Sequence, residues 1–223
     1  MNRSEINQII AEADRFIAGF GMVLPPFAHW SPERMRGPDG AMHRARGLGW
    51  DITDYGAGRF AGMGLVLFTA RNGTLADLTA GRGMLYAEKI MISRRHQVSP
   101  MHRHNLKAED IINRGGGDLV IELFASGPDG GIDRGAEVAV TTDGLARRLP
   151  AGAHLRLAPG ESVTLLPGIW HAFWAEGADC LIGEVSTVND DHSDNVFADP
   201  IGRFATVEED TPPKRLLVSD YDA

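Results

Sequence analysis

The amino-acid sequence predicts a mainly β fold, a single barrel or sandwich that follows a helical N-terminal segment. From about residue 63, short apolar runs recur at close spacing and are divided by Gly, Pro, Asp or Asn. This recurrence is typical of an all-β barrel or sandwich and not of a parallel α/β sheet. The chain has 223 residues, of which 43% are hydrophobic, which is enough for one large core. We therefore expect one domain, with a helical segment at 1–50, a barrel core at 60–190 and a C-terminal extension at 191–223.

The N-terminal segment begins with an amphipathic helix. Ser4 is the expected N-cap, and Gly19 or Gly21 is expected to end the helix. Pro25-Pro26 then breaks the chain, and Ser31-Pro32-Glu33 has the cap and first turn of a short second helix. The apolar residues of the first helix follow the 3.6-residue period and share one face: Ile6, Ile9, Ile10, Ala13, Phe16 and Ile17.

Eight strand-like runs follow the helical segment, and Gly, Pro, Asp or Asn residues divide them. Gly115-Gly116-Gly117 lacks the Lys-Ser/Thr and the strand-to-helix context of a phosphate loop, so it is expected to be a tight turn between strands. The runs are GLVLFTAR, YAEKIMIS, DLVIELF, AEVAVTT, HLRLA, SVTLL, HAFWAE and CLIGEVSTV.

Composition and charge limit the partners and the compartment. The formal net charge of −8 gives no basic surface for nucleic acid or for an anionic membrane. The single cysteine, Cys180, lies in an apolar run, so we expect a buried thiol and a reducing compartment. The first 16 residues carry Glu5, Glu12 and Asp14 without a long apolar stretch, which predicts neither a signal peptide nor a membrane span. A cytoplasmic location is the expectation.

Four side chains have the spacing of a mononuclear metal site. His102, His104 and Glu109 form a His-x-His-x4-Glu pattern, and His171 follows a Pro-Gly turn in LPGIWHAFW. Residues two apart in a strand point to the same face, so both histidines of the first pattern can reach one cavity. Three imidazoles and a carboxylate suit one divalent ion per chain, such as manganese, iron, cobalt, nickel or zinc.

The same residues resemble the two motifs of the cupin superfamily. The first motif is met from His102 to Gly116, except that its leading glycine is replaced by Arg95 or His96. The second is approximated from Gly160 to His171, with Ala175 in the place of its asparagine. These departures leave the four metal positions intact. The resemblance implies a cupin-type β-barrel, or jelly roll, with an N-terminal helical appendage.

Longer segments resemble one cupin family in particular, the bacterial D-lyxose isomerases, over nearly the whole chain. This resemblance implies a ketol-isomerase that interconverts D-lyxose with D-xylulose and often D-mannose with D-fructose. It also implies a divalent metal, commonly manganese, and a homodimer. The segments are NRSEINQIIAEADRFI, LPPFAHWSP, LGWDITDYG, AEKIMISRRHQVSPMHRH, EDIINRGGGDLVIELF, GESVTLLPGIWHAFWAE and LIGEVSTVNDD.

Aldose-ketose isomerisation needs a group that moves a proton between C1 and C2, beside a metal that polarises the carbonyl. Three residues are candidates for that base. Glu184 is a carboxylate within an otherwise apolar run, Lys107 lies between two expected metal ligands, and Lys89 precedes the site in YAEKIMIS. Strand alternation places Lys89 on the face opposite Glu88, where it could bind a hydroxyl group or shuttle a proton.

Other polar and aromatic residues are candidates for sugar binding. Asp190, Asp191 and His192 could line the mouth of the barrel, and Arg203 could reach a sugar hydroxyl or pair with an acidic neighbour. Phe173 shares the face of His171 by alternation, so it is expected to form an apolar wall under the sugar.

Two other functions fit the same ligand set, since many activities share the barrel. An iron-dependent dioxygenase would lose activity without oxygen, whereas an isomerase works anaerobically. A sugar-binding or regulatory cupin would bind sugar and metal but would not exchange the C1/C2 proton with deuterated solvent.

Overall fold

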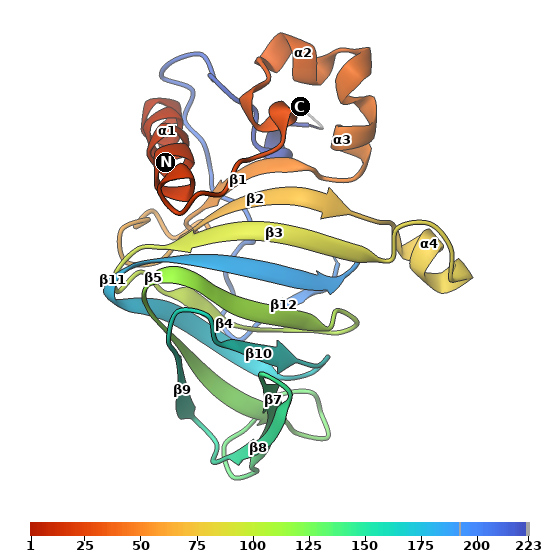
Figure 1. Cartoon of the computed structure of the whole chain (residues 1–223), viewed down its shortest axis with the longest axis vertical. Helices are drawn as coiled ribbons and strands as arrows, with labels where there is room; N and C mark the ends of the chain where they lie inside the picture. Colours follow the sequence, from red (N-terminus) through yellow and green to blue (C-terminus); the bar gives the residue numbers. More distant parts are fainter. Residues whose placement is uncertain (192, 222–223) are drawn as a thin grey trace.

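The protein folds as one antiparallel sheet that bends back on itself, as seen in the computed structural model of Figure 1. The structure describes residues 1–191 and 193–221. Within these residues twelve strands form the sheet, and this confirms the mainly β prediction. They are β1 (Gly49–Thr53), β2 (Leu65–Asn72), β3 (Tyr86–Ser93), β4 (Ser99–His104), β5 (Glu109–Ser126), β6 (Ile132–Asp133), β7 (Val138–Thr142), β8 (Leu145–Leu149), β9 (Ala153–Leu157), β10 (Ser162–Leu165), β11 (Trp170–Thr187) and β12 (Asn195–Phe197).

Two long strands, β5 and β11, hold the two halves of the sheet together. The halves of β11 pair with different neighbours: its first half lies against β4 and the second half of β5, and its second half lies against β3 and the first half of β5. The hydrogen-bonded path runs β1-β2-β3-β11-β5-β10-β7-β8, with β4, β6, β9 and β12 beside it. This path does not close on itself, so the cavity lies between two facing halves of a bent sheet.

The glycine triplet lies at the bend of β5 and not in a turn between strands, so that prediction was wrong. Register shifts in the pairing of β5 with β11 occur around Gly115 and Gly116, opposite Cys180 and Leu181. Gly116 has a φ of 96°, and a Cβ there would clash with the carbonyl oxygen of Asp179. Glycine is therefore required where the two backbones approach and the strand changes direction.

Helix α1 (Arg3–Gly19) packs on the outer face of β1, β2 and β3. Alternate residues of β2 divide between two cores: Val66 and Phe68 contact the helix side, whereas Leu65 and Leu67 face the interior of the bent sheet. Both faces of these strands are therefore covered, which explains their continuous apolar runs. The buried stripe of α1 is the predicted one except that Phe16 is only partly buried.

The helix ends predicted from the local sequence were partly correct. The N-cap of α1 is Asn2 and not Ser4, because Ser4 instead hydrogen-bonds the Asp210 carboxylate with its backbone N–H and its hydroxyl. Gly19 is the last helical residue, as predicted. The N-cap of α2 (Pro32–Arg36) is Ser31, whose hydroxyl accepts a hydrogen bond from the Arg34 N–H.

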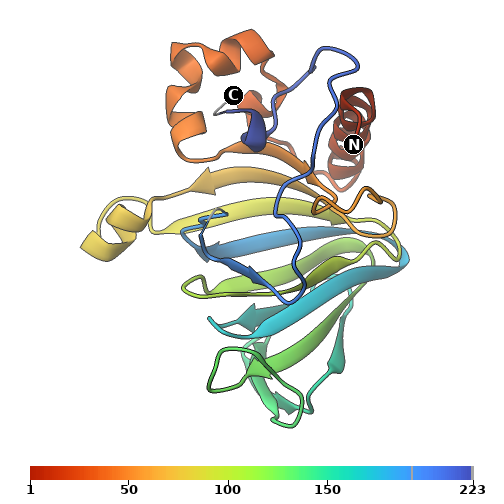
Figure 2. The same ribbon diagram turned by 180° about the vertical axis from the view of Figure 1, so that it is seen from behind.

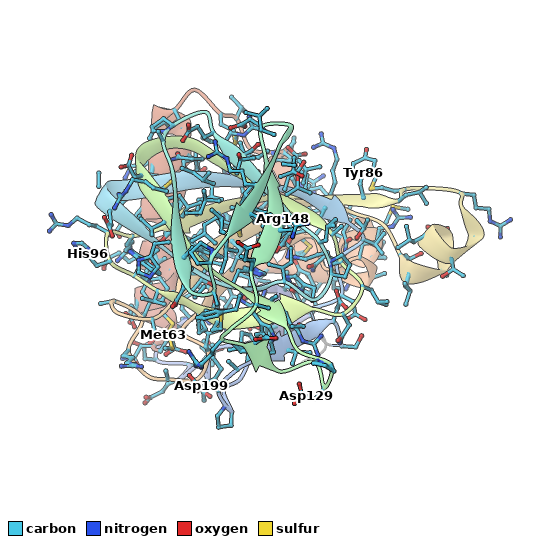
Figure 3. The ribbon with its side chains drawn as sticks, turned by 90° about the horizontal axis from the view of Figure 1, so that it is seen from below. Met63, Tyr86, His96, Asp129, Arg148 and Asp199 are labelled. Carbon is cyan, nitrogen blue, oxygen red and sulfur yellow. The ribbon has the colours of Figure 1, made fainter. Side chains whose placement is uncertain are left out.

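Five further short helical elements, including α4 (Leu75–Ala80), occur in the described residues. Among them, α4 projects from the body between β2 and β3, and Tyr86 lies at its base while His96 lies at the opposite side of the molecule (Figures 1 and 3). The others are η1 (Pro26–His29), η2 (Pro38–Gly40), α3 (Ala41–Ala45) and η3 (Val218–Asp220). Among the described residues, no helix has the length and apolar character needed to cross a membrane.

The chain after β12 returns along the sheet to the helical end, where η3 packs beside β1 (Figure 2). Two strands from outside the expected core, residues 60–190, join the sheet: β1 pairs with β2, and β12 pairs with β4. The division of the chain at these boundaries stays a prediction.

Arg3 ties the first helix to the C-terminal segment. Its side chain is 2% exposed and lies 2.5 Å from the Glu209 carboxylate and 2.8 Å from that of Asp220. Arg3→Ala would leave the half-buried Asp220 without its cation, so we expect the free energy of unfolding to fall by about 2–3 kcal/mol. Urea unfolding measures this loss. Arg15→Ala, at an exposed position of the same helix, is the control, and an equal loss in both variants would contradict the account.

Candidate metal centre and active site

All ten residues predicted for the site line one cavity between the two halves of the sheet. They come from strands β3, β4, β5 and β11 and from the segments that follow β4, β11 and β12. The structure thus brings them together, while their roles remain predictions. The ten are Lys89, His102, His104, Lys107, Glu109, His171, Phe173, Glu184, Asp191 and Arg203.

Three imidazoles converge at one wall of this cavity. His102 and His104 stand two residues apart on β4, and His171 stands directly across from His102 on β11. One ring nitrogen from each of these residues lies within 4.8 Å of the others, so the three can hold a metal ion. Glu109, the first residue of β5, points its Oε1 at the same cluster. This oxygen lies 3.4 Å from His104 Nε2 and 3.2 Å from His171 Nε2.

Backbone carbonyls set the orientation of two of these rings. His102 Nδ1 lies 2.8 Å from the oxygen of Pro100, and His171 Nδ1 lies 3.1 Å from the oxygen of Ile169. A carbonyl oxygen only accepts, so each Nδ1 must carry the hydrogen and each Nε2 keeps a free lone pair. Such outer contacts are the usual support of metal-ligating histidines.

The cluster suits a divalent cation because it leaves buried polar atoms unpaired. Within the described part of the chain, His104 Nε2 and Glu109 Oε1 have no hydrogen-bond partner, although buried polar atoms are normally paired. Burial, together with the nearby His171 and His104, holds the pKa of His102 well below its usual value. Burial and the charge of Lys107 likewise lower the pKa of His104. Both rings are therefore neutral at physiological pH, as metal ligands must be.

These pKa shifts predict that metal binding tolerates mild acid. Two ligand imidazoles of ordinary pKa, about 6.5, would by themselves weaken binding roughly 100-fold between pH 7.5 and pH 5.5. Because the pKa of His102 and that of His104 are lowered, both stay neutral further into acid. We expect the Mn²⁺ dissociation constant to rise about tenfold or less over this range, as measured by calorimetry. A rise of 100-fold or more would contradict the prediction.

Next to the imidazoles, two lysines and two carboxylates form a buried network of ion pairs. Lys107 Nζ lies 2.7 Å from Glu109 Oε2 and 3.0 Å from Glu184 Oε1, and Lys89 Nζ lies 3.6 Å from Glu184 Oε1. All four side chains are 2–4% exposed. Glu184 thus stands between both lysines, and sequence reasoning left these three residues open as alternative bases.

The opposite charges in this network shift the pKa values of three of its side chains and keep those side chains charged. Burial raises the pKa of Glu184, but the attraction of Lys107 and Lys89 outweighs it, and the pKa lies below the usual value. Burial lowers the pKa of Lys107, but Glu109 and Glu184 outweigh that effect and raise it. Burial raises the pKa of Glu109, but Lys107 and the neighbouring His104 and His171 together outweigh it and hold the pKa well below its usual range. Glu184 is therefore an ionised carboxylate at neutral pH, and Lys107 is its cation.

A second ion-pair group adjoins the cavity, which Arg203 and Asp191 help to line. Arg203 Nη2 lies 3.2 Å from Asp191 Oδ2, and Arg203 Nη1 lies 2.7 Å from Asp51 Oδ2. Asp191 also lies 3.7 Å from Lys89 Nζ, which links the two groups. Burial raises the pKa of Asp191, but Arg203 and Lys89 outweigh it and hold the pKa well below its usual range. Burial raises the pKa of Asp51, which Arg203 offsets only in part.

Comparison with known proteins identifies the family. A family model described as D-lyxose isomerase matches residues 1–221. The chain belongs to the D-lyxose isomerase family. Two relatives are D-lyxose/D-mannose isomerases, one from Serratia proteamaculans at 48% identity and one from Escherichia coli O157:H7 at 44%. Each match covers 99% of this chain and 98% of the relative.

The fold of this D-lyxose isomerase family member also occurs in a solved L-ribose isomerase. The structure of the Acinetobacter sp. DL28 enzyme in complex with L-ribose superposes with a TM-score of 0.62, at 16% identity, over 93% of this chain and 98% of that one. At this identity the likeness shows the fold alone. It confirms the predicted cupin-like architecture with its N-terminal helical part.

In this family member, aromatic residues form the apolar side of the cavity. Phe173, Tyr55 and Phe197 all line it, so Phe173 lies on the predicted face. Burial raises the pKa of Tyr55 to about 12, so its hydroxyl stays neutral and shares a 2.8 Å hydrogen bond with Ser99. Trp170 and Trp174 lie elsewhere, with indole N–H groups that bond the Gly130 carbonyl and Glu176.

Sequence reasoning missed several polar residues around the cavity. Asp51 is an acidic residue within the buried strand β1, and this signal is the same one that singled out Glu184. Asn189 accepts a 2.7 Å hydrogen bond from Lys89 Nζ, and no local pattern marks it. Asp190 does not line this cavity but a separate groove next to residues 44–47 and 72–75, and His192 lies outside the described residues.

Proposed function

We propose that the protein is a metal-dependent aldose-ketose isomerase that interconverts D-lyxose with D-xylulose, and also D-mannose with D-fructose. Family membership across residues 1–221 supports the reaction class, and the names of both relatives support these two aldoses. The observation that carries the proposal is geometric. An ionised carboxylate, Glu184, stands in the same cavity as the three-histidine cluster.

The proposed cofactor is one divalent ion per chain, Mn²⁺, with Co²⁺, Fe²⁺, Ni²⁺ or Zn²⁺ as alternatives. His102, His104, Glu109 and His171 would hold it, as supported by the unpaired buried atoms of this cluster. When bound, the ion supplies positive charge that polarises a carbonyl and stabilises the negative charge that follows proton removal. Four protein ligands leave coordination positions open on an octahedral ion.

In the proposed reaction, Glu184 transfers the proton between the two carbons. Its carboxylate takes the proton from C2 of the open-chain aldose and returns it to C1 of the ketose, so the reaction consumes no net proton. The depressed pKa of Glu184 keeps it in the basic form at neutral pH. The hydroxyl proton must at the same time pass from O2 to O1 as the carbonyl moves from C1 to C2. Lys107, protonated and 3.0 Å from Glu184, is placed to donate a proton to O1 and to take one back from O2.

The remaining cavity residues would bind the sugar chain. Lys89, Asp191 and Arg203 offer donors and acceptors for the hydroxyl groups beyond C2, and their mutual ion pairs hold them in position. Phe173 would form the apolar wall under the carbon chain. Because each cation in this wall already has a carboxylate partner, the cavity suits a neutral sugar.

We also propose that the protein is a homodimer and cytoplasmic. The family resemblance supports the first point, and the single buried Cys180 supports a reducing compartment. Light scattering during gel filtration would test the dimer.

The proposal is tested by removing metal with a chelator, restoring Mn²⁺ and assaying D-lyxose, D-mannose and D-xylulose without oxygen. We expect metal to restore interconversion of aldose and ketose. Restored metal with no interconversion of any of these sugars would reject the isomerase. Activity that needs oxygen would indicate a dioxygenase, and sugar binding without turnover would indicate a binding protein.

A further inference from the structure

The loop between His104 and Glu109 is held by the carboxylate of Asp194, which is distant from it in the sequence. Asp194 accepts hydrogen bonds from three successive backbone N–H groups, at Asn105 (3.0 Å), Leu106 (2.8 Å) and Lys107 (2.9 Å). Asp194 is 7% exposed. Successive N–H groups that point at one place form a concave site for an anion, and here the side chain of Asp194 occupies it.

The same carboxylate faces the third imidazole. Asp194 Oδ2 lies 3.8 Å from His104 Nδ1, which is beyond a hydrogen bond but close enough for electrostatic attraction. His102 and His171 each have a backbone carbonyl at Nδ1. Within the described residues His104 Nδ1 has no hydrogen-bond partner. Asp194 thus stands where the other two rings have their orienting acceptor.

We propose that Asp194 is a positioning residue for the metal centre. It favours the His104 tautomer with hydrogen on Nδ1 and a free lone pair on Nε2, and it fixes the loop that carries Lys107. The inference rests on the proposed metal site. It assigns Asp194 no contact with the metal or the sugar, because Asp194 acts through His104 and the loop.

The carboxylate of Asp194 suits this position because both of its oxygens only accept hydrogen bonds. Its two oxygens have enough lone pairs for three N–H donors and for the attraction to Nδ1. A carboxamide of the same shape offers one acceptor oxygen, and its amide hydrogens would face either the loop N–H groups or His104. Asp194→Asn therefore keeps the volume of the side chain but reverses the polarity at one of these partners.

The first test measures Mn²⁺ affinity by calorimetry, in the absence of sugar. We expect Asp194→Asn to weaken binding about 10–100-fold, as outer-sphere partners of metal ligands do. Asp199→Asn makes the same change at an exposed residue on the periphery of the molecule (Figure 3) and should bind Mn²⁺ like the parent protein. Thr187→Val removes a different anchor of the loop, the 3.2 Å bond from the Ala108 N–H, and should bind with less than threefold change.

The second test reads the His104 tautomer directly, from side-chain ¹⁵N shifts of the metal-free protein. In the metal-free protein Glu109 Oε1, 3.4 Å from His104 Nε2, competes with Asp194 for the ring hydrogen. The parent protein should have a detectable population with hydrogen on His104 Nδ1, and Asp194→Asn should shift the population toward hydrogen on Nε2. A parent protein with no detectable hydrogen on His104 Nδ1 would overturn the inference even if no variant folds. So would unchanged Mn²⁺ affinity in a folded Asp194→Asn variant. Failure of the parent protein to bind Mn²⁺ would instead reject the proposed metal site.

Discussion

Glu184→Gln is expected to lower kcat for D-lyxose by about 10²–10⁴-fold while the protein keeps its fold and its metal. The carboxamide has the shape of the carboxylate but cannot accept the C2 proton, and a positioned base contributes about this factor. Metal binding should persist because Glu184 is not among the four proposed ligands. Initial rates with Mn²⁺ in excess, and the metal content of the purified variant, measure both effects.

Glu176→Gln is the matched control for this substitution. Glu176 lies on the same strand, β11, but pairs with Arg156 on the outside of the sheet. The kcat of the Glu176→Gln variant should therefore equal that of the parent protein. Near-normal turnover of Glu184→Gln would remove Glu184 from its role and leave Lys107 or Lys89 as the base.

His171→Ala is expected to abolish activity by removing the metal. His171 is the member of the cluster that comes from β11, and it is buried beside His102 and Glu109. Loss of an outer-sphere partner typically weakens metal binding about 10–100-fold, and loss of a direct ligand should cost at least as much. Plasma mass spectrometry should find substoichiometric Mn²⁺ after dialysis, with kcat reduced in proportion.

The fold of this variant should survive, because the pairing of β11 with β5 depends on its backbone and not on the imidazole. His154→Ala removes an exposed ring that packs on Trp174 outside the cavity, and it should retain metal and activity. Full Mn²⁺ occupancy in a folded His171→Ala protein would exclude His171 as a ligand.

Local periodicity predicted much of the fold but not its longest elements. The stripe of α1 and the runs of β2 and β3 were visible because alternation and the helical period are local properties. The continuity of β5 was not, since Gly115 and Gly116 look like a turn until the opposing backbone of β11 is in place. Strand β12 was missed because three residues, Asn195–Phe197, carry little periodic signal.

The site was predictable where its chemistry is compact in the sequence. His102, His104 and Glu109 lie within eight positions, and Glu184 stands out as a carboxylate in an apolar strand. Asp194 could not be found this way, because its role appears only when the chain brings it within hydrogen-bond distance of residues 105–107.

The central claim is that a metal-loaded cavity moves a proton between adjacent carbons of a free sugar. The direct measurement is deuterium incorporation from D₂O into D-lyxose and D-xylulose, followed by NMR with metal-free and Mn²⁺-restored protein. The account predicts deuterium at C1 of D-xylulose and C2 of D-lyxose only after Mn²⁺ is restored, at a rate that collapses in Glu184→Gln. Interconversion that proceeds equally fast without any metal would contradict it.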